Sequence, residues 1–231
     1  MKLDIKKKTS TTNTTVSKNR KIEYIVIHYT AGISSVKGKA ASTATYFSKE
    51  TTKASADFIV DDSTIVQYNP DIKNRYCWHC GGSKLNTKGG TFYKKCTNKN
   101  SIGIEICSNN YTGKIQDPNA SSWYFTYGAV SNAEKLVIEL MKEYDIPISN
   151  VIRHYDVTGK LCPGIFGWNN ESGSETTWVD FKNSIAEAIS IDTATVPVNE
   201  YITLKSKYNI LMSDYNELKE KYDAIAKIVN G

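Results

Sequence analysis

Short apolar runs separated by polar turns dominate most of the chain. Residues 24–28 (YIVIH) and 150–154 (NVIRH) predict buried strands that each end in a histidine. Two further runs within residues 57–68 flank a polar pair and predict a hairpin. In residues 101–107 (SIGIEIC) every second position is isoleucine, which predicts a strand whose Glu105 points away from the isoleucine face.

Helical periodicity appears between these strands. Residues 40–49 and 177–189 predict helices. A third helix is expected to begin at a capping box made by Ser131 and Glu134 and to stop at Pro147. Strands mixed with helices, with a hairpin among them, predict an α/β fold in which a mixed central β-sheet is flanked by helices.

The sharpest periodicity follows a linker-like stretch, residues 191–197. Across residues 198–229, large apolar side chains recur at alternating spacings of three and four, which is a heptad pattern. The seam consists of Tyr201, Leu204, Tyr208, Leu211, Tyr215, Leu218, Tyr222, Ile225 and Val229. Because a lone helix with an exposed stripe is marginal in water, we expect a coiled-coil-like segment over residues 198–231 that forms a homo-oligomer. Docking on the preceding domain and wall binding are the alternatives.

Charge is concentrated at the start of the chain. Residues 1–22 carry seven Lys/Arg and one Asp, whereas the middle of the chain is close to neutral. This pattern is not the broad basic face of a nucleic-acid-binding protein. The basic segment, residues 1–21, is interpreted either as an aid to adhesion on an anionic surface or as a solvated tail.

Export and membrane signals are missing from the sequence pattern. The N-terminus lacks the apolar core of a signal peptide, so we expect synthesis without a classical export signal. No run of 18 apolar residues occurs, so stable membrane insertion is not expected.

Three histidines and five cysteines supply the candidate metal chemistry. Cys162 follows His154 by eight residues, and His28 ends another predicted strand. Two imidazoles and one thiolate can form a catalytic zinc site, although a histidine at a strand end can also be a satisfied core residue. Cys77 and Cys80 form a Cys-x-x-Cys pair, which leaves open a structural zinc or redox protein.

Four segments resemble, in order, the amidase type 2 family, which includes phage amidase lysozymes and peptidoglycan-recognition proteins. They are IVIHYTAG (residues 25–32), WHCGGS (78–83), SIGIEIC (101–107) and RHYDVTGKLCPG (153–164), and the second is usually written with alanine where Cys80 stands. The resemblance covers about residues 22–190. It implies a zinc amidase domain over that range.

The resemblance also implies roles for individual residues. His28, His154 and Cys162 would bind Zn²⁺, Lys160 would stabilise the oxyanion, and Glu105 would exchange protons with water and the leaving amine. The plainer interpretations are an ordinary loop lysine and a glutamate on a solvated sheet face.

One departure from the family pattern affects the general base. Many relatives carry an aromatic residue or histidine before the second strand, where this chain has Ala56 and Asp57. This puts more weight on Glu105 as the base. Two interpretations remain open for His79: it orients substrate, or it caps a loop.

The expected function is therefore zinc-dependent hydrolysis of the amide bond between N-acetylmuramic acid and L-alanine in bacterial peptidoglycan. The resemblance favours a phage or prophage endolysin that waits in the host cytoplasm before lysis. A non-catalytic peptidoglycan-binding module of the same fold is the alternative.

Overall fold

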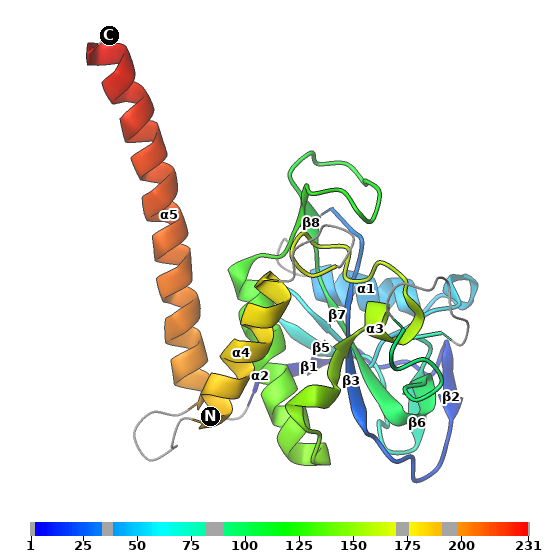
Figure 1. The fold of residues 1–231 in the computed structure, drawn as a ribbon. Coiled ribbons are helices and arrows are strands. Elements are labelled where there is room, and N and C mark those ends of the chain that lie inside the picture. The colour runs from blue at the N-terminus through cyan, green and yellow to red at the C-terminus, as the bar shows by residue number, and fades with distance from the viewer. Residues whose placement is uncertain (1–2, 34–38, 82–89, 170–175, 191–197, 231) are drawn as a thin grey trace.

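A six-stranded mixed sheet forms the centre of the computed structural model, which describes residues 3–33, 39–81, 90–169, 176–190 and 198–230 (Figure 1). In spatial order the strands are β1 (Ile5–Lys7), β5 (Ile65–Gln67), β4 (Phe58–Val60), β7 (Ser101–Ile106), β3 (Tyr24–Tyr29) and β10 (Val151–Arg153). Neighbouring strands run parallel except for β4 and β5, which form the predicted hairpin. The expected mixed sheet is confirmed.

Strand alternation divides the core between the two faces of the sheet. The isoleucines of β7 face α2 (Tyr127–Tyr144) and α4 (Thr176–Ser190), where Leu136, Phe181 and Ile185 are buried with them. On the opposite face Ile59 and Val66 pack against α1 (Lys39–Phe47). Because successive side chains point to opposite faces, the residues between the isoleucines of β7 point away from α2 and α4.

The beginning of the chain is part of the folded body. Strand β1 pairs in parallel with β5, and β2 (Thr14–Val16) pairs antiparallel with β6 (Arg75–Cys77). Leu3 and Ile5 also pack against the main core. The expectation of a solvated tail is therefore wrong for these strands, because edge pairing and apolar contacts hold them.

Helix α2 begins earlier than predicted. Thr126 is its N-cap, and its hydroxyl oxygen accepts a hydrogen bond from the backbone N–H of Ala129 at 3.3 Å. Ser131 and Glu134 lie buried inside the helix, so the predicted capping box is wrong. Small side chains on the sheet-facing side, including Ala129, extend the packed stripe by a turn. The helix ends at Tyr144, before Pro147, as predicted.

Shorter elements complete the body. They are a second hairpin, β8 (Asn109–Asn110) with β9 (Trp123–Tyr124), the short helix α3 (His154–Thr158), and the 3-10 turns η1 (Glu50–Thr52), η2 (Asn98–Asn100) and η3 (Ile148–Asn150).

The heptad segment is one helix, α5 (Val198–Asn230). Near its start Ile202 is buried against the main core, and Lys205 forms a 2.9 Å ion pair with Glu187 of α4. Beyond this base α5 extends away from the body as a long arm (Figure 1). The predicted linker, residues 191–197, lies outside the described residues. Among the helices described, none is long and apolar enough to cross a membrane.

Candidate metal and catalytic site

The site lies at the carboxyl ends of three parallel strands, the usual location for function in open α/β sheets. His28 is the penultimate residue of β3 and is buried. It stands in register with Glu105 of β7, so both side chains are on the sheet face away from α2 and α4. The expectation that Glu105 points away from the isoleucine face therefore agrees with the register.

His154 and Cys162 come from the neighbouring strand and the loop that follows it. Strand β10 ends at Arg153, one residue before the prediction, and His154 opens α3. The chain then turns back so that the backbone N–H of Tyr155 donates to the carbonyl of Cys162 at 2.9 Å. This hydrogen bond holds the Cys162 loop beside the start of α3.

The three side chains expected to bind metal converge in one buried group. One donor atom from each of His28, His154 and Cys162 lies within 4.8 Å of the others. Cys162 Sγ is 3.6 Å from His28 Nδ1, and His154 Nδ1 is buried without a hydrogen-bond partner. Zinc bonds of about 2.0–2.3 Å to nitrogen and sulfur fit donors at this separation. The unpartnered His154 nitrogen is the kind of atom that a metal would satisfy.

Burial sets the protonation of these donors. It lowers the pKa of His28 well below its ordinary value, and the neighbouring His154 adds to the effect. It lowers the pKa of His154 to about 3. Both imidazoles are therefore neutral near pH 7, the form that binds metal. Burial and then Glu105 raise the pKa of Cys162 to about 12, whereas Lys160 opposes that rise.

His79 lies directly behind His28. Its Nδ1 is 3.1 Å from His28 Nε2, and its Nε2 is 3.1 Å from Ser101 Oγ. Ser101 donates its hydroxyl hydrogen to the carbonyl of Thr97, so its oxygen accepts from His79 Nε2–H. His79 Nδ1 must then accept from His28 Nε2–H, because a neutral imidazole has one N–H. The chain of hydrogen bonds leaves the His28 Nδ1 lone pair facing Cys162.

A glycine makes room for this arrangement. A Cβ added to Gly103 of β7 would lie 2.6 Å from Cγ of His79, closer than side-chain atoms can approach. The His79 ring therefore packs on bare backbone. Of the two interpretations left open for His79, neither described this contact, and no spacing in the sequence indicates it.

Glu105 and Lys160 supply the remaining charges. Glu105 is partly buried, and its Oε2 is fully buried without a hydrogen-bond partner. Desolvation raises the pKa of Glu105 to about 8, with Lys160 acting in the opposite direction. The Lys160 side chain is exposed, and its charge lowers the pKa of both His28 and His154. A carboxyl that titrates near neutrality thus stands beside a cation at the edge of the metal-binding group.

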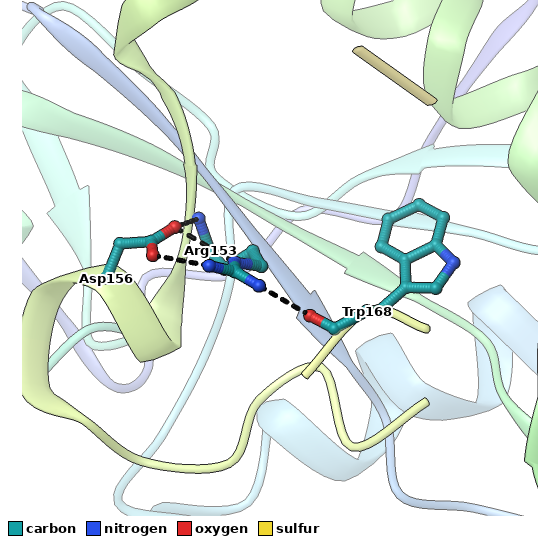
Figure 2. Close-up of polar contacts among 3 residues, drawn as sticks. All are labelled: Arg153, Asp156 and Trp168. Carbon is teal, nitrogen blue, oxygen red and sulfur yellow. Dashed lines mark hydrogen bonds and ion pairs between the residues drawn. The ribbon is translucent and has the colours of Figure 1, made fainter. Parts of the chain in front are cut away.

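An arginine clamp holds α3 against the loop that carries Cys162. Figure 2 shows Arg153 reaching both ways, with its guanidinium donating to the Asp156 carboxylate at 2.8 Å and to the Trp168 carbonyl at 3.0 Å. Asp156 also accepts from the Arg153 backbone N–H at 2.8 Å. Sequence reasoning assigned Arg153 and Asp156 no role, although their spacing of three before the cysteine suits such a pair.

The remaining cysteines are packed thiols rather than members of a second metal site. All five thiols are buried and free, and Cys77 and Cys80 belong to different apolar clusters. Within the described ranges, one group of three or more potential ligands comes within metal-binding reach, and it is the group that contains Cys162. Asp57, at the position that departs from the family pattern, accepts hydrogen bonds from Asn69 and from the backbone of Gly103. It therefore supports the strand beneath His79.

Comparison with known proteins identifies the family. The family described as N-acetylmuramoyl-L-alanine amidase (Amidase_2) matches residues 18–165. The chain is 37% identical over 141 residues to the N-acetylmuramoyl-L-alanine amidase CwlH of Bacillus subtilis, which covers 61% of this chain and 46% of that protein. It is 34% identical over 182 residues to XlyA of the same organism, covering 74% of this chain and 53% of XlyA.

Solved structures show the same fold. The catalytic domain of XlyA superposes with a TM-score of 0.56 at 29% identity, covering 79% of this chain and 99% of that domain. PlyL superposes with a TM-score of 0.55 at 27% identity, covering 79% of this chain and 97% of PlyL. The chain spans about half the length of the curated relatives it matches. On the family match, the sequence identity and the shared fold, the chain belongs to the N-acetylmuramoyl-L-alanine amidase family.

Proposed function

We propose that this chain hydrolyses the amide bond between N-acetylmuramic acid and L-alanine in bacterial peptidoglycan, using one zinc ion. The observation that carries the proposal is the buried group of His28, His154 and Cys162, with donor atoms within 4.8 Å of one another. The relatives named as N-acetylmuramoyl-L-alanine amidases indicate which bond is cut.

Zinc would be held by Nδ1 of His28, Nδ1 of His154 and Sγ of Cys162. When bound, the ion supplies Lewis acidity that lowers the pKa of water and polarises a carbonyl. Three protein donors, rather than four, are the number that catalytic zinc sites use. Burial raises the pKa of Cys162 to about 12, and the backbone N–H of Tyr29 partly opposes that rise, in the direction of the thiolate form required of a ligand.

Glu105 is the proposed proton carrier. Its raised pKa of about 8 places it near the operating pH, where a carboxyl group can both accept and return a proton. It would take a proton from the attacking water and deliver it to the leaving L-alanine amine. Lys160, exposed at the rim, would place its ammonium group against the oxyanion that develops on the scissile carbonyl.

The alternative is a module of the same fold that binds peptidoglycan without cutting it. Binding alone needs no metal donors, whereas this chain keeps two imidazoles and a thiol together in a buried group. Burying these three groups with an unsatisfied nitrogen lowers the stability of the fold. A module that only binds peptidoglycan would have no need for such a group. The donor set therefore favours the enzyme.

Digestion of purified walls from several Gram-positive species tests the proposal. We expect new L-alanine amino termini without new reducing sugar ends, and we expect Cys162→Ala to release neither. Wall binding by the wild-type chain without release of L-alanine termini would support the binding module instead. New reducing ends would contradict the assigned bond.

We further propose an endolysin role, because the chain is similar to the solved structure of a mutant endolysin from Bacillus subtilis, with 30% identity and a TM-score of 0.54. In that role the protein stays in the host cytoplasm until the membrane is breached. Expression inside a susceptible host should leave cells intact until a membrane-permeabilising agent is added. Lysis before permeabilisation would contradict this order of events.

A further inference from the structure

We propose that α5 is a dimerisation arm, which pairs in parallel and in register with α5 of a second copy of this chain and so joins two catalytic domains. The arm surface is defined as the seam residues beyond the base of α5 whose side chains the structure describes: Leu204, Tyr208, Leu211, Tyr215 and Leu218.

The arm surface is uncovered. Leu204, Leu211 and Leu218 are 69%, 66% and 67% exposed, and the two tyrosines are 60% and 57% exposed. Scattered apolar side chains on a surface are ordinary, but these five recur along one side of a single helix. A 33-residue helix that presents such a stripe to water lacks the packing that stabilises helices in proteins.

The catalytic domain does not occupy this surface. At the base of α5, Tyr201 and Ile202 pack against the catalytic domain, Lys205 pairs with Glu187, and Asn209 lines the cavity between α5 and α4. At 3.6 residues per turn, Ile202 and Asn209 lie roughly a third of a turn from the centre of the seam, whereas Lys205 flanks its tyrosine edge. Beyond its base, α5 projects away from the body (Figure 1). The five arm-surface side chains are exposed there, so they are open to a second helix.

The repeat identifies the partner as a helix. On a straight α-helix, a strict seven-residue repeat drifts around the helix by about 20° per heptad. The stripe therefore stays on the face that contacts a partner only if the two helices wind around each other. A flat wall polymer or a globular surface does not select that repeat. By sequence the heptad pattern runs from Tyr201 to Val229, so an identical helix in register presents the same pattern beyond the base of α5.

Charge favours the parallel alignment. Flanking positions g and e′ are matched in a parallel pair, and by sequence Asp214 occupies a g position and Lys219 the matching e′ position. Lys207 faces Met212 in the same alignment, so no like charges meet there. Lys205 forms an ion pair with Glu187 of its own chain. Helix–helix pairing is therefore limited to the part of α5 beyond its base.

The functional consequence is avidity. In a parallel pair the two catalytic domains would lie at the same end of the paired helices, so both could reach one polymer surface. Once one domain binds, the second acts at a raised effective concentration. Once a partner helix covers them, Tyr208 and Tyr215 would keep their hydroxyl groups at the edge of the pair, in reach of water.

The oligomeric state of the 231-residue chain tests the pairing, measured by sedimentation equilibrium at tens of micromolar. We expect the wild type to have twice the mass of one chain and Leu211→Glu with Leu218→Glu to be a monomer. Ile210→Glu is the matched control, because Ile210 is 42% exposed on the same helix but lies outside the seam. It should remain a dimer. Circular dichroism and the catalytic domain's Tm check that each variant is folded.

Cross-linking tests the orientation. Leu218→Cys places a thiol in the seam, where a parallel in-register pair brings the two copies together, and mild oxidation should yield a disulfide-linked dimer. Ser213→Cys, exposed on the opposite side of α5, is the control and should not cross-link. A monomeric wild type, a trimer, a dimeric leucine variant, or equal cross-linking at both positions would each overturn the proposal.

Discussion

Nε2 of His28 lies 3.1 Å from Nδ1 of His79, and their rings meet edge to face with centroids 5.2 Å apart. His79 passes the interaction on to Ser101, whose hydroxyl donates to the carbonyl of Thr97. One backbone carbonyl thereby fixes which nitrogen of His28 carries hydrogen. Such outer contacts orient the imidazoles that bind metals.

His79→Ala should therefore weaken zinc binding while leaving the protein folded. Removing the acceptor frees the His28 ring to rotate and to change tautomer, and loss of such a contact typically costs about 10–100-fold in metal affinity. The zinc Kd is measured by competition with a chromophoric chelator. His79→Gln, whose amide oxygen can accept the same hydrogen bond, should lose less. An unchanged Kd in His79→Ala would show that the contact is only packing.

Removal of the metal should abolish hydrolysis, and added zinc should restore it. Cys162→Ser should bind zinc more weakly, because an alcohol ionises far less readily than a thiol. Cys96→Ser is the control, since Cys96 is buried in an apolar cluster and is not one of the three donors. Metal content by atomic absorption should be one zinc per chain for wild type and Cys96→Ser. Full activity of metal-free Cys162→Ala is the result that would contradict this prediction.

Glu105→Gln and Lys160→Met should slow the chemical step. Each keeps approximate size but removes either proton transfer or the positive charge, and loss of a general base costs about 10²–10⁴-fold in rate. Turnover on intact walls is compared with zinc stoichiometry and Tm, both of which should stay close to wild type. Near-normal turnover in either variant would show that the residue has no role in the chemical step.

Arg153→Met should destabilise the fold through the clamp in Figure 2. The Arg153–Asp156 pair is largely buried, with side chains 6% and 20% exposed, and breaking a buried pair costs roughly 3–5 kcal/mol. Lys6→Met is the control, because its pair with Asp4 is 63% and 79% exposed and should contribute less than about 1 kcal/mol. Urea unfolding gives both values. If the two substitutions lowered the free energy of unfolding equally, the buried Arg153–Asp156 pair would contribute no more than the exposed one.

Glu134 should make stability depend on pH. Burial raises the pKa of Glu134 to about 7, whereas an unfolded glutamate titrates near 4.5. Between these values the folded chain binds more protons than the unfolded one, so stability should fall as pH rises from about 4.5 to about 7. The shift corresponds to roughly 3 kcal/mol. In Glu134→Gln the free energy of unfolding should no longer fall with pH between about 4.5 and 7. An unchanged dependence on pH would show that Glu134 is not its source.

Local periodicity was enough to predict many elements of the fold. Alternating isoleucines identified β7, helical spacing identified α1 and α4, and the heptad repeat identified α5. These patterns are readable because each depends on a few neighbouring residues whose side chains share one face. The order of motifs also indicated the family before any contact was known.

Tertiary packing decided what no local window contains. Strands β1 and β2 form because β5 and β6, about 60 residues away, accept their backbone hydrogen bonds. Helix α2 starts early because small side chains such as Ala129 pack on the sheet, which overrides the capping signal at Ser131. The contact of His79 with His28 depends on Gly103, a residue of a different strand. Such long-range pairings arise from the folded arrangement, so the sequence alone supplied the chemical groups and the structure supplied their partners.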